Sequence, residues 1–218
     1  MLNPQVIDRG EGRMTQAERT ALSDQRMFEA AIELINEHGT QKTTLKEIGE
    51  RAGYSRGLAS YRFGSKDGLM LELFERFDGL WKEHLQNYIT NAGGLKAVQQ
   101  ASNALRDFLK KESRYLRAMY LLWYESLGYE SDMRRMLAEH HDVYRNDAKA
   151  WIEQGIATGE IKSTVDATQF AAQYCAFIFG IVYQWVVNSD ALDIDAVFNS
   201  YIENAFTVLS STENTTDK

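Results

Sequence analysis

The charged side chains between residues 51 and 66 are suited to binding a polyanion. They are all basic, because the stretch contains Arg51, Arg56, Arg62 and Lys66 and no aspartate or glutamate. This charge of +4 stands in a chain whose formal net charge is −7. A local cationic face on an acidic protein is better explained by a polyanionic partner such as DNA than by general solubility. The simpler alternative is the solvated surface of a small helical hairpin.

The other reactive side chains do not form a recognisable catalytic or metal site. No spacing of acids, bases or nucleophiles points to a catalytic centre, so we expect the protein not to be an enzyme. The single cysteine, Cys175, lies among apolar residues and is expected to be a buried small hydrophobe. His140 and His141 are adjacent, and neighbouring helical residues point about 100° apart, which makes them poor joint metal ligands. We therefore expect neither a metal nor a cofactor.

The cationic stretch overlaps a pattern of two short helices joined by a tight turn. Thr44 followed by Glu47 is a capping-box pattern that predicts the start of the first helix. Apolar residues at helical spacing follow it, namely Leu45, Ile48 and Ala52. Gly53 suits a helix end, and Ser55 is a candidate N-cap for a second helix over about 56–62. This arrangement predicts a helix-turn-helix, whose second helix can enter the major groove of DNA.

Residue types within these helices allow DNA contacts to be assigned by chemistry. We expect Arg56 to read a base, most naturally guanine, and Gly57 to allow close approach of the backbone. Thr44 and Ser55 are expected to present hydroxyls and helix N-terminal amides to phosphates, with capping alone as the alternative. The further candidates are Ser60 and Arg62 for bases, Lys46 for a phosphate or base edge, and Leu58 for a thymine methyl or the core.

The run AGYSRGLASYRFGSKDGL, residues 52–69, resembles the signature of the tetracycline-repressor (TetR) family of bacterial transcription regulators. The matching features include alanine-glycine, an apolar residue, serine, a basic residue and glycine, then an aromatic, phenylalanine and Ser-Lys-acid-x-Leu. The resemblance covers roughly residues 20–70. It implies that Lys66 grips a phosphate and that Tyr61 meets the DNA backbone. For Tyr61 the alternative is packing of its ring against the first helix.

The rest of the chain predicts an all-α protein. Pro4 is the only proline, so no later residue is barred from a helix, and we find no alternating strand pattern. Apolar periodicity predicts helices over about 20–37, 66–88, 95–111, 113–127, 131–158, 167–188 and 195–209. The N-terminus lacks the apolar core of a signal peptide, which together with the lone cysteine leads us to expect a cytoplasmic protein.

Charge and periodicity divide the chain into four expected parts. They are a mobile N-terminal arm over 1–19, a three-helix helix-turn-helix DNA-binding domain over 20–68, a helical ligand-binding and dimerisation domain over 69–210, and a disordered tail over 211–218. Acidic and basic residues balance through residue 68, whereas the remainder carries the whole net charge of −7. The boundary then falls within a helix, and a continuous helix can transmit movement between domains.

The stretch 168–189 contains no charged residue and includes CAFIFGIVYQWVV. Glutamines interrupt it and Asp166 and Asp190 flank it, so we favour a helix buried inside the protein and against a second subunit over a membrane span. We expect a homodimer built from the last two helices through Ile178, Ile181, Val182, Trp185, Val197, Tyr201, Ala205 and Val208. The alternative is that these residues complete a monomeric core.

The middle of the chain is rich in aromatic residues, most of which we expect in the core. Such walls with few charges also suit a small amphipathic or aromatic ligand, and the family resemblance implies an inducer pocket here. The candidate lining residues are Trp81, Tyr120, Trp123, Tyr174 and Phe177. We therefore expect a dimeric repressor that binds a near-palindromic DNA operator and is released by a small molecule. The alternatives are an all-α protein–protein adaptor, or a small-molecule-binding protein without DNA binding.

Overall fold

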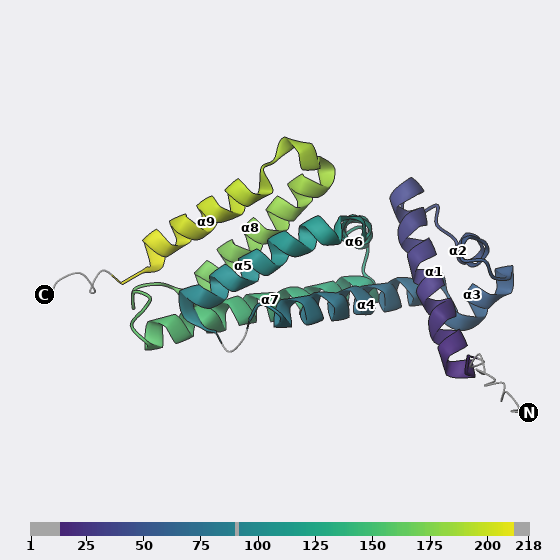
Figure 1. Cartoon of the computed structure of the whole chain (residues 1–218), viewed down its shortest axis with the longest axis horizontal. Helices are drawn as coiled ribbons and strands as arrows, with labels where there is room; N and C mark the ends of the chain where they lie inside the picture. The colour runs from purple at the N-terminus through teal and green to yellow at the C-terminus, as the bar shows by residue number, and fades with distance from the viewer. Residues whose placement is uncertain (1–13, 90–91, 212–218) are drawn as a thin grey trace, which may run out of the picture.

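The structure is a computed structural model that describes residues 14–89 and 92–211, with the backbone alone at Arg56. Helices make up nearly all of this described part. The helices are α1 (Gln16–His38), α2 (Leu45–Arg51), α3 (Arg56–Phe63), α4 (Lys66–Gln86), α5 (Gly94–Lys111), α6 (Ser113–Ser126), α7 (Asp132–Ala157), α8 (Ala167–Val187), the 3-10 helix η1 (Ser189–Ala191) and α9 (Ile194–Leu209). Figure 1 shows α1–α3 as a head at one end of the molecule and α5–α9 as a helical body, with α4 joining them. The predicted all-α fold is confirmed.

The two ends of the described chain are more ordered than the sequence pattern indicates. The backbone amide of Thr15 donates to the Glu18 carboxylate at 2.7 Å, and the Glu18 amide donates to the Thr15 hydroxyl at 3.2 Å. This capping box starts α1 at Gln16, so the part of the expected arm after residue 15 is helical. At the other end the Ser211 amide donates to the Glu160 carbonyl at 3.0 Å. The rest of the expected arm and tail, 1–13 and 212–218, lies outside the described residues.

Gly49 and Gly53 allow the two helices of the helix-turn-helix to pack closely. A Cβ atom added to Gly49 on α2 would lie 3.0 Å from the Ser55 carbonyl oxygen and 3.7 Å from the Ala59 Cβ on α3. Gly53 takes φ +82° between the two helices, a conformation that suits glycine. The predicted capping box is confirmed, because the Thr44 hydroxyl accepts from the Glu47 amide at 3.2 Å. The turn therefore fixes α3 against α2 mainly through backbone proximity.

Helix α4 contributes to the core of both the head and the body. Its buried side chains are Leu69, Met70, Leu73, Phe74, Phe77 and Asp78. All of them except Asp78 belong to one continuous apolar cluster that includes residues of α1, α3, α6 and α8. The Phe74 ring lies edge-on to Trp123 of α6 at 6.1 Å and to His140 of α7 at 4.6 Å. Because one core spans the junction, α4 cannot shift at one end without repacking the other.

Helix α8 is buried on one side only. It is the one helix of the described chain that is long and apolar enough to cross a membrane, by length and composition alone, and 28% of its most apolar window is buried. Tyr174, Ile181 and Val182 face the interior, whereas Ala172 and Ala176 are exposed. Within the single chain the inner side of this helix is buried as expected and its outer side is open to solvent, so burial of that side against a second subunit stays a prediction.

Truncating Phe74 should destabilise the whole molecule, because this side chain is 1% exposed at the junction of α4, α6 and α7. We expect Phe74→Ala to lower the free energy of unfolding by about 3–5 kcal/mol, measured by chemical denaturation. The control is Leu80→Ala on the same helix, which is 39% exposed and should cost less than about 0.5 kcal/mol. Equal losses for both variants would show that α4 does not carry a shared core.

Candidate nucleic-acid interface and ligand cavity

The recognition helix of the predicted helix-turn-helix presents one face to solvent. Ala59 and Phe63 of α3 are buried against the head, whereas Gly57, Ser60 and Tyr61 are exposed. Tyr61 is 89% exposed, so the alternative that its ring packs against the first helix is wrong. Figure 1 shows that α3 lies at the end of the molecule remote from α9. A rigid, accessible helix of this kind has the geometry needed to enter a groove.

Two arginines of the cationic stretch whose side chains are described, Arg51 and Arg62, are engaged by carboxylates of α1 and α4. The Arg62 guanidinium of α3 binds Asp24 of α1 at 3.0 Å and pairs in bidentate fashion with Glu72 of α4 at 3.0 and 3.1 Å. These bonds raise the pKa of Arg62 and keep it charged. Arg51 binds Glu37 at 2.8 Å. The assignment of Arg62 to base reading is therefore corrected, because its guanidinium holds three helices together.

Other predicted contact residues remain accessible. Lys46 is exposed, and neither it nor Lys66 forms an ion pair with any described residue. The Lys66 ammonium group lies 3.4 Å from the Gln41 carbonyl oxygen, close to exposed Lys42, which was not among the predicted contacts. The side chain of Arg56, the predicted base reader, lies outside the described residues. The cationic character of this face therefore depends on lysines rather than on the arginines that the structure describes.

The predicted N-caps differ in how they use their hydroxyl groups. The Thr44 hydroxyl both accepts from the Glu47 amide and donates to the Glu47 carboxylate at 2.8 Å. Ser55 occupies the N-cap of α3, but its side chain makes no capping hydrogen bond, so that part of the expectation is wrong. Its exposed hydroxyl is available to another acceptor or donor. Leu58 is half-buried against the core, which favours its structural alternative.

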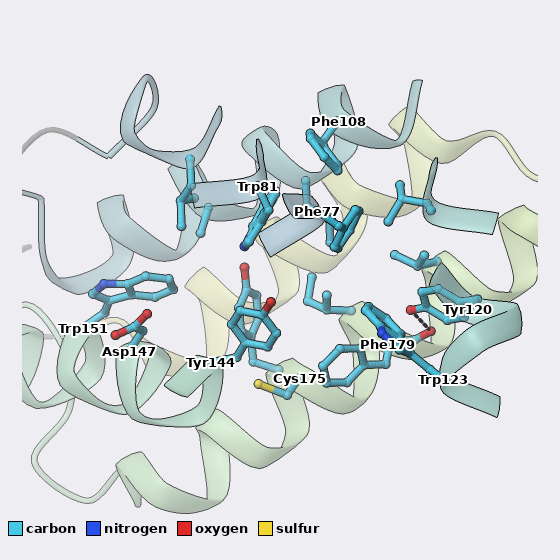
Figure 2. Close-up of a pocket in the computed structure, with 17 residues that line it drawn as sticks. Phe77, Trp81, Phe108, Tyr120, Trp123, Tyr144, Asp147, Trp151, Cys175 and Phe179 are labelled. Carbon is cyan, nitrogen blue, oxygen red and sulfur yellow. Dashed lines mark hydrogen bonds between the residues drawn. The ribbon is translucent and has the colours of Figure 1, made fainter. Parts of the chain in front are cut away.

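A cavity of about 100 Å³ lies in the body, between α4, α5, α6, α7 and α8 (Figure 2). Its lining is Phe77, Trp81, Leu85, Ala101, Leu105, Phe108, Leu116, Tyr120, Trp123, Tyr144, Asp147, Trp151, Tyr174, Cys175, Ile178, Phe179 and Val182. The predicted lining residues Trp81, Tyr120, Trp123 and Tyr174 are brought together here. Phe177 is not, and that prediction is wrong: its ring stacks on Tyr201 of α9 at 3.7 Å between centroids.

Helix α7 also contributes to this cavity, which was not predicted from the sequence. Tyr144, Asp147 and Trp151 are spaced three and four residues apart and share one helical face that lines the cavity. That spacing is visible in the sequence, but the polar residues around it hide the pattern. Cys175 also lines the cavity, and burial raises the pKa of its thiol, so it stays protonated at neutral pH. The predicted small buried role of Cys175 fits its 7% exposure.

Several polar groups of the cavity already have partners within the protein. The Tyr120 hydroxyl donates to the Phe179 carbonyl at 3.1 Å, and the Tyr174 hydroxyl lies 3.1 Å from that of Ser102. Burial raises the pKa of both phenols, so they remain neutral. The Trp123 indole nitrogen is buried and has no hydrogen-bond partner among the described residues. An apolar ligand with few polar groups suits such a lining.

The two adjacent histidines of α7 contact different helices. The His140 ring nitrogen lies 3.1 Å from the Asp78 carboxylate of α4, which also binds Lys82 at 2.6 Å. The His141 ring lies against Phe179 of α8, at 4.4 Å between centroids. Burial lowers the pKa of His141 and favours its neutral form. His140 and His141 thus join α7 to its two neighbours rather than converging on a shared ligand.

The residues predicted for a dimer interface have different positions in the structure. Ile181 and Val182 are 5% and 2% exposed within the chain's own core, so neither is available to a partner and both assignments are corrected. Ile178 lines the cavity. Trp185, Val197, Tyr201 and Ala205 are half-buried, and Val208 is 66% exposed. The predicted stripe on α8 is its inward face, since the most apolar face of a helix normally packs on the nearest core.

The outer faces of α8 and α9 carry smaller and more polar residues. On α8 the exposed positions include Ala172, Gln173, Ala176, Tyr183 and Val187. On α9 they include Ala196, Asn199, Ser200, Glu203, Asn204, Thr207 and Val208. Val187 and Val208 are each 66% exposed. Small residues on adjacent turns allow close approach of another helix.

Comparison with known proteins extends the resemblance over most of the chain. Residues 28–73 match the family model described as bacterial regulatory proteins, tetR family. Residues 97–206 match the model of the BetI-type transcriptional repressor C-terminal region. The fatty acid metabolism regulator protein of Bacillus subtilis (strain 168) is 25% identical over 181 residues, which cover 81% of this chain and 90% of that protein.

Solved structures share the same fold. The FadR regulator of Bacillus subtilis, solved in complex with stearoyl-CoA, superposes with a TM-score of 0.72 at 20% identity, covering 84% of this chain and 98% of that one. The complex of SmeT, a repressor from Stenotrophomonas maltophilia, with triclosan gives a TM-score of 0.69 at 18% identity, covering 88% and 93%. With both family models matched in order along the chain, the protein belongs to the TetR family of transcription regulators.

Proposed function

We propose that the protein is a repressor that binds a near-palindromic DNA operator as a homodimer and releases it when a small molecule enters the cavity. The observation that carries this proposal is the exposed face of α3, with Gly57, Ser60 and Tyr61 open to solvent on a firmly packed helix. Family membership makes a regulatory role the expected use of that face. We propose that the protein is located in the cytoplasm, because the DNA that it would bind is there.

The cavity and the head are connected through α4, which suggests how a ligand could act. Phe77, Trp81 and Leu85 of this helix line the cavity, whereas Glu72, closer to its start, binds Arg62 of α3. A ligand that binds better to a second arrangement of α4 would change the position of α3 and weaken operator binding. Relatives solved with stearoyl-CoA and with triclosan support a ligand-binding role for this body. We propose the same class of switch here.

The test of DNA binding is selection of random duplexes on the purified protein, followed by titration of the recovered sequence at several salt concentrations. We expect an inverted repeat, and a steep fall of affinity with salt as lysines displace counterions from phosphates. Lys66→Ala should reduce the salt slope by about 1 and weaken all sequences alike. Arg56→Ala should cost about 1–3 kcal/mol and relax preference at one base pair.

The control for these two variants is Lys96→Ala, which removes an exposed lysine from α5, in the body. It should leave both affinity and salt slope unchanged. An adaptor or a ligand-binding protein without DNA binding would recover no inverted repeat and would show no counterion release. Either result would refute the proposed regulator.

Arg62 should affect DNA binding through the position of α3 and not through base contacts, because its guanidinium is bound to Asp24 and Glu72. We expect Arg62→Gln to lower stability by about 1 kcal/mol, since the group is a third exposed and screened by water. Affinity should fall for every sequence while the base preference found by selection is unchanged. The control Arg117→Gln alters an exposed arginine of α6. Loss of preference at one base pair would instead identify Arg62 as a direct reader.

The proposed dimer uses the outer faces of α8 and α9, where Ala176 is exposed at the middle of α8. Arginine at this position would bury an unpaired charge at the interface, at a cost of about 3–5 kcal/mol. We expect Ala176→Arg to convert the dimer to a monomer, as measured by light scattering after size-exclusion chromatography. The matched control is Ala150→Arg, at an exposed position of α7. A dimer that survives the Ala176 change would place the interface elsewhere.

A further inference from the structure

The cavity described above has an unusual distribution of charge. Among the lining residues that the structure describes, Asp147 alone has a charged side chain, and the rest are aromatic, aliphatic, cysteine or alanine. No lysine, arginine or histidine lines the cavity in the described structure. A ligand with a carboxylate or phosphate would therefore find no counter-charge there and would meet a carboxylate instead. The lining can therefore pack against the apolar part of a ligand, and its one carboxylate favours a ligand with a positive charge.

Asp147 has no hydrogen-bonding or ion-pair partner among the residues that the structure describes. It makes no hydrogen bond and no ion pair with any described residue, whereas nearby Lys82 is already bound to Asp78 at 2.6 Å. Burial raises the pKa of Asp147, and Lys82 opposes this rise without reversing it. Asp147 lines the cavity while its side chain remains exposed to solvent, and a cation placed beside it would gain an attraction that no described group satisfies. The carboxylate is thus free to pair with a cationic ligand that occupies the cavity.

Aromatic rings accompany Asp147 at its end of the cavity. Figure 2 shows Asp147 beside Trp151, with Tyr144 and Trp81 next along the cavity and Tyr120 and Trp123 at the opposite end. The faces of tryptophan and tyrosine attract cations, and tryptophan does so most strongly. Since a quaternary or protonated amine is satisfied by aromatic faces and one carboxylate, this end has the components of a cation site. The opposite end offers only apolar contact and the unpaired Trp123 indole N–H.

We propose that the effector cavity binds a lipophilic monocation, with its ammonium group beside Asp147 and its apolar body directed toward Tyr120 and Trp123. A water-sized group needs about 10–15 Å³ of such space, so about 100 Å³ accepts a ligand of several non-hydrogen atoms, such as a ring bearing an ammonium group. This proposal depends on the proposed function in one respect, namely that the bound ligand is the effector that releases the operator. The binding preference itself is a property of the cavity.

The test compares three probes of similar shape and different charge on the full chain. They are benzyltrimethylammonium, its neutral isostere neopentylbenzene, and the anion 4-tert-butylbenzoate, with binding followed by tryptophan fluorescence, because Trp81, Trp123 and Trp151 line the cavity. We expect the cation to bind about tenfold more tightly than the isostere, and the anion to bind more weakly than both. An isostere or anion that equals the cation would overturn the proposal, as would failure of the cation to bind.

Variants locate the charge preference. Asp147→Asn keeps the shape of the side chain and should weaken cation binding about fivefold while changing isostere binding less than about twofold. Glu139→Gln removes one negative charge from an exposed position of the same helix and should change neither. Circular dichroism and thermal unfolding verify that both variants are folded. Equal cation affinity in wild type and Asp147→Asn would show that this carboxylate does not select the ligand.

Operator release is measured separately, so that the two proposals can fail independently. If the cation binds through Asp147 but leaves operator affinity unchanged, the ligand preference stands and the proposed switch is refuted. If a neutral or anionic compound releases the operator and cations neither bind nor act, the switch stands and the cation preference is refuted. Release by the cation in wild type, lost in Asp147→Asn but retained in Glu139→Gln, would support both.

Discussion

The architecture depends on burial of one face of α4 in a core that the head and the body share. Leu69 and Phe74 are 0% and 1% exposed and belong to the same apolar cluster as residues of α1 and α8. Full burial of a side chain of this size contributes about 1.5–3 kcal/mol, so the junction is held by packing rather than by a hinge. The head and the body therefore cannot move independently, because shifting either one disturbs contacts that stabilise the other.

Ion pairs add directional restraint to this packed junction. Arg62 joins α3 to both α1 and α4, so the helix that would face DNA has its orientation set by the helix that lines the cavity. A guanidinium suits this role because its planar donors bind two carboxylates at once. The same contacts neutralise an arginine that would otherwise add to the cationic face. The ion pairs of Arg62 thus weaken the attraction of the head for a polyanion but fix the orientation of α3.

The body combines a well-packed interior with a cavity that is left open. Phe77 and Trp81 of α4 contact Phe108 at 5.8 and 5.4 Å between centroids, which fixes one wall of aromatic rings. Asp147, in contrast, faces the same space without a partner among the described residues. The cavity therefore combines rings whose packing stabilises the fold with one solvent-exposed carboxylate that makes no such contribution.

The sequence by itself determined the order of the helices, the cap of α2 and the helix-turn-helix, because these depend on local spacing such as Thr44 with Glu47 and on the glycine at 53. It also determined an aromatic cavity in outline. Only the tertiary structure decided that Arg62 is bound by Asp24 and Glu72, that Phe177 packs on Tyr201, and that Asp147 lines the cavity. Those outcomes depend on which faces of distant helices meet, and helical periodicity gives a face but not its neighbour.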